Sequence, residues 1–476
     1  MIGARSQTDE RLPTPADGNR RLRVRVAPSP KTLDEYYRSV ERRMPVSVSP
    51  DYAPLVTPNG NSQEKVHRWF HFKEAFSSRL LARILEDTEL RERRHLRILD
   101  PFAGVGTTLV SAGEAVACGE LRQVTAYGIE CNPFLHLVAS SKVAALQRPP
   151  SGLLKLAQKL AAVASRRPTD AEVAVPGLST FQRPEFFDRS ELQRLLLIRE
   201  AIDQEAASGT PDDLLNLCRL ALGAVVEPVS NLRRDGRALR YVPAKSPRPT
   251  AVQGFLDKVE QIAEDLPREG LKLAGAVLSG DGRSLSPLNT RYPAFDLVLF
   301  SPPYPNNIDY TEVYKLENWL LGFIADGEEF ALQRLKTVYS HPSLLRPDPL
   351  PSRDLTGAEN QLVTRTVAPL IDHLPEDRYS SGRTRMLRGY VLDMYLSLRS
   401  ARNRVAPGGY IVYVVGNSIH GSSSASLVIA ADLLIAELAM ALGYDLVGVG
   451  VARQLRRRFV DSPYLRESIV TLRLPR

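Results

Sequence analysis

The residues best suited to chemistry are Ser301-Pro302-Pro303-Tyr304, which follow an apolar run at 295–300. Neither proline can donate a backbone hydrogen bond, and Pro303 favours an extended conformation at Pro302, so the Pro302 carbonyl oxygen has a set direction. The Ser301 hydroxyl is a second acceptor, and Tyr304 adds a flat aromatic face. Two acceptors beside an aromatic ring could hold a planar ring by its exocyclic amine. Taken alone, the four residues are also typical of an ordinary proline turn.

A second candidate site follows the apolar run at 96–99, where the chain reads Asp-Pro-Phe-Ala-Gly-Val-Gly-Thr-Thr at 100–108. A strand, a glycine-bearing turn and a helix in succession let a nucleotide-like ligand approach the backbone closely. The turn lacks the third glycine of the dinucleotide fingerprint and the Gly-Lys-Ser/Thr of a phosphate loop. The pattern therefore favours a ligand with a nucleoside but no pyrophosphate.

Glu130 ends the next apolar strand, at 124–129. An acidic residue at the end of the second strand is the usual partner of ribose hydroxyls. By itself Glu130 would be an ordinary exposed carboxylate, and its position after the glycine turn favours the ribose interpretation.

Both candidate sites need a parallel sheet, because such a sheet places the carboxyl ends of its strands at one edge, where ligands bind. The continuous apolar run 295–300 is typical of a central parallel strand. Periodicity also predicts helices at 76–85, 312–321, 388–404 and 425–442, and later strands at 410–416, 445–451 and 468–474.

Length and composition restrict the possible class of protein. The chain has 476 residues, 43% hydrophobic and 24% charged, which predicts two domains or one domain with large insertions. No apolar run is long enough to span a membrane, and the N-terminus lacks the apolar core of a signal peptide, so we expect a cytoplasmic protein. The three cysteines and seven histidines show no metal-ligand spacing. The net charge of +8 is only weak evidence for a polyanionic binding partner.

The 100–108 sequence together with Ser301-Pro302-Pro303-Tyr304 resembles the S-adenosylmethionine-dependent DNA amino-methyltransferases, which act on cytosine N4 or adenine N6. The resemblance covers about 65–145 and 275–420. It implies an α/β fold with a Rossmann-like, seven-stranded, mostly parallel sheet (class I methyltransferase), and S-adenosyl-L-methionine as cofactor. It implies catalytic roles for Ser301, Pro302, Pro303 and Tyr304, and cofactor contacts from Phe76, Asp100, Pro101, Phe102, Gly104, Gly106, Thr107, Thr108, Glu130 and Asp281.

Two further segments enter through this resemblance. Residues 72–77 are similar to the family's helix that precedes the glycine loop and contacts the cofactor. Residues 278–283 are similar to its third-strand motif, in which the acid, here Asp281, receives the adenine amino group. Glu130 and Asp281 lie about 150 residues apart, whereas a simple doubly wound unit needs roughly 20–40.

That interval, 150–272, is predicted to be a helical insertion, with helices at 153–164, 191–202 and 212–226. It also holds a polar stretch at 229–241 with four arginines. Because Arg and Asn read base edges and Arg binds phosphate, this stretch is a candidate DNA-recognition region or, alternatively, a solvated loop. The candidate contacts are Asn231, Arg233 and Arg234.

A second basic segment, 378–404, holds seven arginines against one acid, Asp393, a local charge of +6. Its candidate nucleic-acid contacts are Arg383, Arg385 and Arg388. The predicted organisation is a disordered or loose arm at 1–45, a first methyltransferase part at 46–149, the insertion at 150–272, and a second methyltransferase part at 273–476 with an irregular insertion at 325–387.

These residues predict a site-specific methyltransferase that modifies the exocyclic amine of a flipped base in double-stranded DNA, without a metal. Serine at 301 favours cytosine N4 over adenine N6. A restriction or defence-system protein is the kind of partner such an enzyme has. The alternatives are an RNA or protein N-methyltransferase, and a catalytically inactive nucleic-acid-binding protein on the same fold.

Overall fold

The computed structural model describes residues 32–476 except 168–174, 179–180, 182, 236–238, 244–247, 289–291, 293, 344–345, 422–425 and 457–459. Its largest sheet has eight strands in the order β1-β11-β12-β8-β7-β2-β3-β6. These strands are β1 (Val46–Val48), β2 (Leu96–Asp100), β3 (Val124–Glu130), β6 (Leu273–Ser279), β7 (Phe295–Phe300), β8 (Val405–Gly416), β11 (Asp445–Gln454) and β12 (Arg466–Arg473).

The sheet is Rossmann-like, as predicted. β6, β3, β2, β7 and β8 are mutually parallel, β12 runs antiparallel to β8 and β11, and β1 pairs parallel to β11. The sheet has one strand more than the seven implied by the resemblance, namely β1, which begins directly after the segment assigned to a loose arm. Within that segment, residues 1–31 lie outside the described residues, and α1 (Leu33–Glu41) is an ordered helix with a capping box at Thr32.

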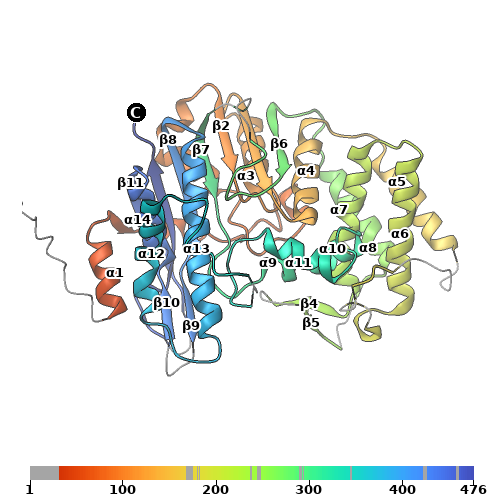
Figure 1. The fold of residues 1–476 in the computed structure, drawn as a ribbon. Helices are drawn as coiled ribbons and strands as arrows, with labels where there is room; N and C mark the ends of the chain where they lie inside the picture. The colour runs from red at the N-terminus through yellow and green to blue at the C-terminus, as the bar shows by residue number, and fades with distance from the viewer. Residues whose placement is uncertain are drawn as a thin grey trace, which may run out of the picture.

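The apolar run of β7 is buried along its whole length, as expected for a central parallel strand. Its side chains alternate between two hydrophobic clusters. Leu297 and Leu299 pack with α3 (Thr107–Ala117) and α4 (Pro133–Gln147), whereas Phe295, Val298 and Phe300 pack with the helices on the opposite face. Those opposite helices are α1, α12 (Gly357–Ile371), α13 (Ser380–Arg402) and α14 (Ala431–Ala441) (Figure 1).

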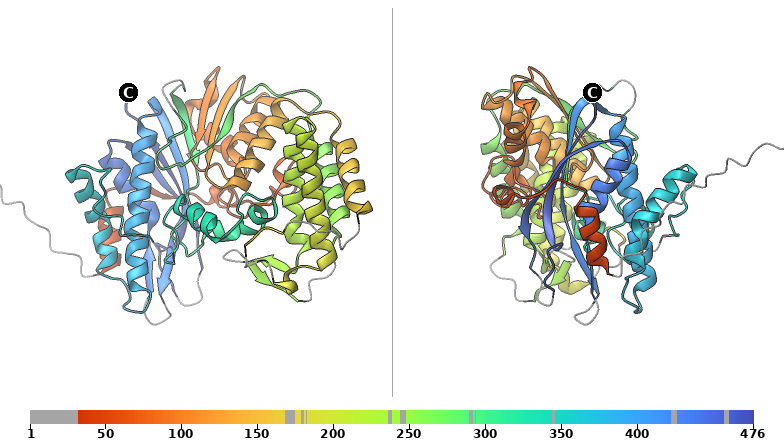
Figure 2. Two further views of the ribbon diagram at one scale, coloured as in Figure 1. Left: turned by 45° about the vertical axis from the view of Figure 1, so that its right-hand side comes forward. Right: turned by 90° about the vertical axis from the view of Figure 1, so that its left-hand side faces the viewer.

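The insertion is helical, as predicted. It contains α5 (Leu153–Arg166), α6 (Arg189–Ala207), α7 (Asp212–Val229) and α8 (Ala251–Asp265). It also contains a hairpin of β4 (Leu232–Arg234) and β5 (Leu239–Tyr241). These helices pack as a bundle against α4, beyond the β6 edge of the sheet (Figure 1 and the left-hand view of Figure 2).

Several local predictions were wrong, mainly at helix ends and in the region 325–387. That region holds α11 (Gly327–Leu335), α12 and the first turns of α13 rather than an irregular chain. Side-chain caps at Asp326 and Thr356 start the first two helices, and the prolines fall in the connections or near a helix end.

The other differences are smaller. The helix predicted at 312–321 is divided into α9 (Tyr310–Val313) and α10 (Lys315–Leu320). α2 (Leu80–Asp87) starts four residues after the predicted 76, and α14 follows a hairpin of β9 (Ser418–Gly421) and β10 (Ser426–Ile429). Within the described ranges, no helix has both the length and the apolar character needed to cross a membrane.

Candidate active site

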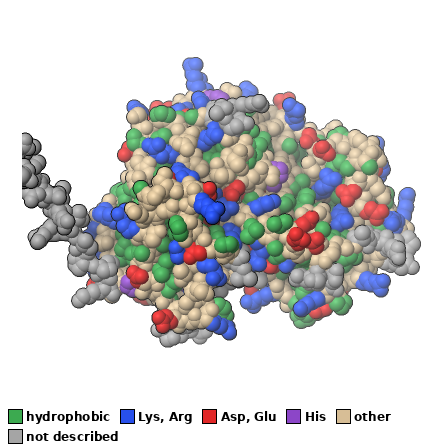
Figure 3. Space-filling model, viewed as in Figure 1, with side chains coloured by type: hydrophobic (Ala, Val, Ile, Leu, Met, Phe, Trp, Pro, Cys, Tyr) green, Lys and Arg blue, Asp and Glu red, His purple; other side chains and the backbone are tan. Residues whose placement is uncertain are grey.

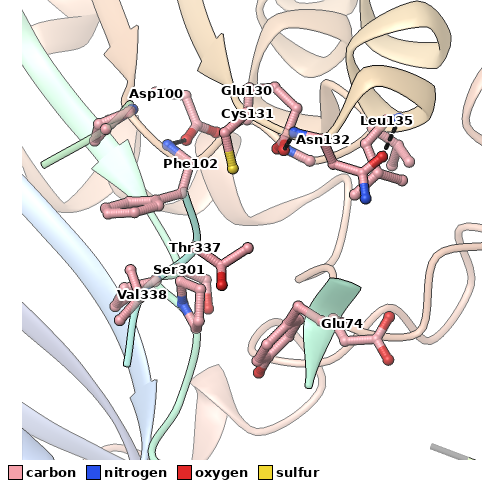
Figure 4. A pocket seen from close by; sticks show the side chains of 18 of the residues that line it. Glu74, Asp100, Phe102, Glu130, Cys131, Asn132, Leu135, Ser301, Thr337 and Val338 are labelled. Atoms are coloured by element: carbon pink, nitrogen blue, oxygen red, sulfur yellow. Dashed lines mark hydrogen bonds between the residues drawn. The ribbon is translucent and has the colours of Figure 1, made fainter. Parts of the chain in front are cut away.

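A pocket of about 330 Å³ opens at the carboxyl edge of the sheet. Its walls come from the chain just after β2, β3, β6 and β7, together with residues 72–76 and 336–338. Figure 4 shows Asp100, Phe102, Glu130 and Ser301 converging from these separate segments. The two motifs that lie two hundred residues apart therefore face one cavity.

Asp281 lies in the same pocket despite its distance from Glu130 in sequence. β6 pairs in parallel with β3 over its whole length, which makes it the third strand of this half of the sheet. A Cβ atom at Gly282 would lie 2.1 Å from the Pro101 carbonyl oxygen, so the two loops touch backbone to backbone and only glycine fits. The predicted third-strand assignment agrees with this geometry.

Most of the predicted catalytic and cofactor-binding residues line the pocket, and two of them do not. Gly106 and Thr108 lie behind the wall rather than in it. Gly106 takes a φ of 81° at the start of α3, where an added Cβ would lie 3.2 Å from the Ala139 Cβ. Thr108 is fully buried, and its hydroxyl donates to Asp100 Oδ2 at 2.5 Å. The residues that do line it are Phe76, Asp100, Pro101, Phe102, Gly104, Thr107, Glu130, Asp281, Ser301, Pro302, Pro303 and Tyr304.

Two acids of the pocket, the buried Asp100 and the half-buried Glu130, are held by backbone amides. Glu130 accepts hydrogen bonds from the Gly104 N–H at 2.8 Å and the Asn132 N–H at 2.7 Å. Asp100 accepts from the Phe102 N–H at 3.0 Å. Burial raises the pKa of each carboxyl group to about 7, and these hydrogen bonds oppose the shift because they favour the carboxylate. The hydrogen bonds thus fix both carboxyl groups in position at the pocket wall.

Asp281 is held by a different kind of partner, the side chain of Arg283. Arg283 Nη2 lies 2.7 Å from Asp281 Oδ2, and the Arg283 backbone N–H donates to Oδ1 at 2.9 Å. The same guanidinium group pairs with Asp393 of α13 at 3.2 Å. Asp281 therefore faces the pocket as a carboxylate that is already paired.

The loop at 301–304 is fixed from three directions. The Ser301 hydroxyl lies 3.0 Å from the Tyr304 hydroxyl and 3.1 Å from the Val414 carbonyl oxygen on β8. The Tyr304 hydroxyl donates to Glu467 Oε1 of β12 at 3.2 Å, and the Tyr304 backbone N–H donates to the Tyr310 hydroxyl at 3.2 Å. The loop is rigid for reasons beyond its two prolines.

Sequence reasoning missed several residues of the pocket wall. Asn132 caps α4 from the position before Pro133, a pattern that could have been read as a helix start. Glu74 lies in the segment compared with a family helix, but residues 72–76 form a turn; Glu74 accepts from the Tyr314 hydroxyl, and burial raises its pKa. Other wall residues carry no sequence signal, and they include Cys131, Leu135, Lys336, Thr337 and Val338.

Three curated proteins to which the chain is similar are type II methyltransferases. The chain is 24% identical over 454 residues to M.AvaI of Nostoc sp., covering 87% of the chain and 86% of that protein. It is 26% identical over 300 residues to M.BsoBI of Geobacillus stearothermophilus, covering 56% of the chain and 55% of that protein. It is 24% identical over 398 residues to M.MvaI of Kocuria varians, covering 80% and 82% respectively. The chain is thus similar to type II methyltransferases over most of its length.

This relationship confirms the family resemblance carried by the two motifs. No family model matches the chain. Among solved structures, the rRNA methyltransferase AviRa of Streptomyces viridochromogenes aligns with a TM-score of 0.27 at 12% identity, over 84% of this chain and 85% of that one. A class I S-adenosylmethionine-dependent methyltransferase of Listeria monocytogenes aligns with a TM-score of 0.28 at 11% identity, over 84% and 59%. At such TM-scores these structures add nothing to the fold argument, which rests on the sheet order.

One of the three predicted nucleic-acid contacts at 229–241, Arg234, is buried. The Arg234 guanidinium group pairs with Glu227 at 3.0 Å and with the buried Glu317 of α10, and it donates to the Val313 carbonyl oxygen at 3.0 Å. Arg234 is therefore a structural residue, and the prediction that it contacts DNA does not fit this geometry.

The two neighbours of Arg234 differ from it. The Asn231 side chain donates to the Glu185 carbonyl oxygen at 2.8 Å and accepts from Arg248, so it holds the base of the hairpin. Arg233 is exposed. Of the three predicted contacts in this stretch, Arg233 is the one placed to meet a polyanion.

Two of the three arginines predicted in α13, Arg383 and Arg388, also have local partners. Arg383 is buried and forms two 2.9 Å hydrogen bonds with Asp377. Arg388 pairs with Asp348 at 2.8 Å and donates to the Leu350 carbonyl oxygen, while Arg385 is half-buried. On the face shown in Figure 3, basic side chains are interspersed with acidic ones rather than gathered in one patch. Three of the seven arginines of this segment, Arg383, Arg388 and Arg399, form ion pairs with acids outside it, so part of the charge counted along the sequence is compensated in space.

Among the described residues, no group of three or more His, Cys, Asp and Glu side chains is arranged to hold a metal ion.

Proposed function

We propose that the protein is a site-specific, S-adenosylmethionine-dependent DNA methyltransferase that modifies the exocyclic amine of a flipped base. The observation that carries the proposal is the single pocket lined both by the Gly104 loop with Glu130 and by the loop 301–304. A cofactor site and an amine-binding loop at one sheet edge are what transfer between two bound molecules requires. The similarity to M.AvaI, M.BsoBI and M.MvaI, all type II methyltransferases, supports DNA as the substrate.

The pocket suits S-adenosylmethionine by its donor and acceptor chemistry. Three acids, Asp100, Glu130 and Asp281, face a ligand that carries hydroxyl and amine donors and a positive charge. Glu130 would accept from the ribose hydroxyls, and Asp281 from the adenine amine. Phe76 and Phe102 supply apolar wall on either side. Bound there, S-adenosylmethionine supplies a methyl group on a positively charged sulfur atom.

The loop after β7 would hold the target base. An exocyclic amine is a weak nucleophile because its lone pair is delocalised into the ring. Ser301 Oγ and the Pro302 carbonyl oxygen would accept its two protons, which favours a pyramidal nitrogen with its lone pair directed at the methyl group. Because the amine lies inside a stacked duplex, the base must be flipped out, and Tyr304 offers the ring on which it would stack. We assign cytosine N4 ahead of adenine N6 because position 301 is serine.

The similarity to type II methyltransferases also suggests a biological role for the protein. A type II methyltransferase suggests a restriction–modification system, so a nuclease of the same specificity is the functional partner we propose. Recognition of the target would come from the insertion hairpin, where Arg233 is exposed.

Incubation with S-adenosylmethionine carrying a deuterated methyl group tests the proposal. Parallel reactions would contain duplex DNA, RNA or protein extract, followed by hydrolysis and mass spectrometry of the products. We expect label on N4-methyldeoxycytidine. N6-Methyldeoxyadenosine would preserve the amine chemistry and reverse the cytosine preference. Label on cytosine carbon 5, or only in RNA or protein, would overturn the proposal.

A further inference from the structure

A chain of hydrogen bonds leads from the amine-binding loop to a buried acid on the last strand of the sheet. The Ser301 hydroxyl donates to the Tyr304 hydroxyl at 3.0 Å, and the Tyr304 hydroxyl donates to Glu467 Oε1 at 3.2 Å. Glu467 Oε2 accepts from Arg453 Nε at 2.7 Å. When the serine proton is directed at Tyr304 rather than at the Val414 carbonyl oxygen, the donors point one way along this chain, from the pocket toward Glu467.

Methylation of the amine requires a group that accepts a proton from it. When the amine nitrogen forms its bond to the methyl carbon, the carbon–sulfur bond breaks and its electron pair stays on sulfur. The nitrogen is left positively charged with one proton too many. The Pro302 carbonyl oxygen can accept a hydrogen bond but is far too weak a base to keep that proton. Ser301 alone has the same weakness, so the proton needs a stronger base beyond it.

We propose that Ser301, Tyr304 and Glu467 form a relay that carries this proton away from the methylated amine. The proton passes to Ser301 Oγ as the serine proton passes to the Tyr304 oxygen and the tyrosine proton passes to the Glu467 carboxylate. Glu467 becomes a neutral carboxylic acid, both hydroxyl groups keep one proton each, and the charge on nitrogen is removed. Glu467 touches neither substrate nor cofactor, so it is a positioning and proton-accepting residue behind the loop. This inference rests on the proposed function.

The surroundings of Glu467 suit this role. Its side chain is nearly buried, on β12 between β8 and β11, and the residue facing it on β8 is Gly416. Gly416 has no side chain, and an added Cβ there would lie 2.7 Å from the Tyr304 ring, so glycine makes room for the tyrosine. The charged and titratable groups that act on Glu467 are Arg453 from β11 and Tyr304 from the loop, with Tyr310 close behind. Burial raises the pKa of Glu467 and Arg453 opposes that rise.

The alternative donor direction at Ser301 does not break the relay. The serine hydroxyl has one proton, and the Val414 carbonyl oxygen at 3.1 Å can accept it in the resting state. A lone pair on Ser301 Oγ then faces the amine or the Tyr304 hydroxyl. Rotation of one hydroxyl group restores the direction needed for transfer.

Single-turnover methylation of duplex DNA across pH tests the relay with matched variants. In the wild-type protein the rate should fall at low pH, as Glu467 becomes protonated. Glu467→Gln should slow methyl transfer by roughly 10- to 100-fold, within or below the usual range for a lost general base, and should abolish this acid limb. Tyr304→Phe keeps the ring but removes the middle hydroxyl, so it should slow transfer similarly. The double variant should lose no more than either single variant.

Arg453→Gln separates proton acceptance from a purely structural role. It keeps the relay but removes the positive charge beside Glu467, so the acid limb should move to higher pH. The carbon-13 shift of the Glu467 carboxyl group, measured without substrate, should titrate at a correspondingly higher pH. Glu437→Gln is a matched control, because Glu437 also accepts from a tyrosine hydroxyl, Tyr36 at 3.2 Å, and pairs with Arg43 at 2.9 Å, remote from the pocket. That variant should keep the wild-type rate and profile.

The possible results distinguish failure of the relay from failure of the proposed function. If the wild-type protein transfers methyl groups to DNA but Glu467→Gln or Tyr304→Phe keeps the wild-type rate and acid limb, the relay is wrong and the proposed function stands. An acid limb that does not move in Arg453→Gln also contradicts the relay. If the wild-type protein transfers no methyl group to DNA at any pH, the proposed function itself fails.

Discussion

The cofactor pocket and the arginine-rich segments differ in what fixes their side chains. In the pocket, Asp100 and Glu130 sit at the ends of strands and are held by backbone N–H groups two to twenty-six residues away. In the arginine-rich segments, Arg234 and Arg388 are held by carboxylates of other elements, Glu317 and Asp348. The position of a short acidic side chain at a strand end is set mainly by the local backbone. The position of a long arginine side chain depends on which acidic partner the tertiary structure places within its reach.

This difference changes what each region can be expected to do. The pocket acids converge on a cavity, so their chemistry remains available to a ligand. Arg383, Arg388 and Arg399 are paired with Asp377, Asp348 and Glu359, none of which lies within 378–404. A charge count along that segment therefore overstates the field it presents to DNA.

The largest expected effect contrasts two adjacent arginines. Arg234→Met leaves Glu317 buried without its counter-charge, which should lower the free energy of unfolding by roughly 3–5 kcal/mol. Arg233→Met, at an exposed position, should change it by less than about 0.5 kcal/mol. Urea unfolding of both variants measures the difference. An equal loss of unfolding free energy in the two variants would show that Arg234 is no more important for stability than the exposed Arg233.

On the pocket side of the comparison, Glu130→Gln should raise the S-adenosylmethionine dissociation constant by roughly 10- to 100-fold, since hydrogen bonds to a charged group contribute about 1.5–3 kcal/mol. Turnover at saturating cofactor should fall much less, because a ribose contact acts alike in the ground and transition states. Calorimetry and steady-state kinetics give the two quantities. An equal loss in both would place Glu130 in the chemical step instead.

The pKa of Glu130, raised to about 7 by burial, predicts a pH dependence of cofactor binding. Ribose hydroxyls donate hydrogen bonds and so prefer the carboxylate, and affinity should therefore be lost as pH falls through about 7. Between pH 8 and pH 6 the dissociation constant should rise about tenfold. Glu130→Gln should remove most of this dependence, and a wild-type profile that is flat from pH 6 to 8 would contradict the burial argument.

The smallest expected effect concerns salt. Arg233→Gln should reduce the slope of log affinity against log salt concentration for duplex DNA by about 1, as expected for one lost phosphate contact. Arg383→Gln should leave the slope unchanged, because its guanidinium group is buried against Asp377. Binding titrations at several salt concentrations measure both. The opposite result would mean that the α13 arginines leave their partners when DNA binds.

The sequence predicted the positions of the pocket acids better than those of the arginines, because the acids lie at strand ends and the arginines depend on tertiary contacts. β2, β3 and β7 and the residues at their ends were predictable, because apolar strands and turn residues are local signals. β6 entered only through the family resemblance, since its residues alternate irregularly between buried and exposed. The spatial position of Asp281 required the resemblance, since a whole helical insertion separates it from Glu130. β1 was missed because three residues give no periodicity.

Glu467 could not be found from sequence at all. It lies 163 residues from Tyr304, and nothing around it resembles a motif. The pairing of β12 with β8 brings it to the loop, and that pairing is a tertiary fact. The same holds for the burial of Arg234, whose neighbour Arg233 has an identical side chain and the opposite environment.

The central claim is that the loop after β7 performs the transfer while the Gly104 side of the pocket holds the cofactor. Ser301→Ala tests it most directly, in single-turnover methylation of DNA beside a cofactor-binding titration. The account predicts a transfer rate lower by roughly 10- to 1000-fold, the range for one deleted transition-state hydrogen bond, with cofactor affinity nearly unchanged. Wild-type transfer by Ser301→Ala, or a loss of cofactor affinity that explains the whole defect, would contradict it.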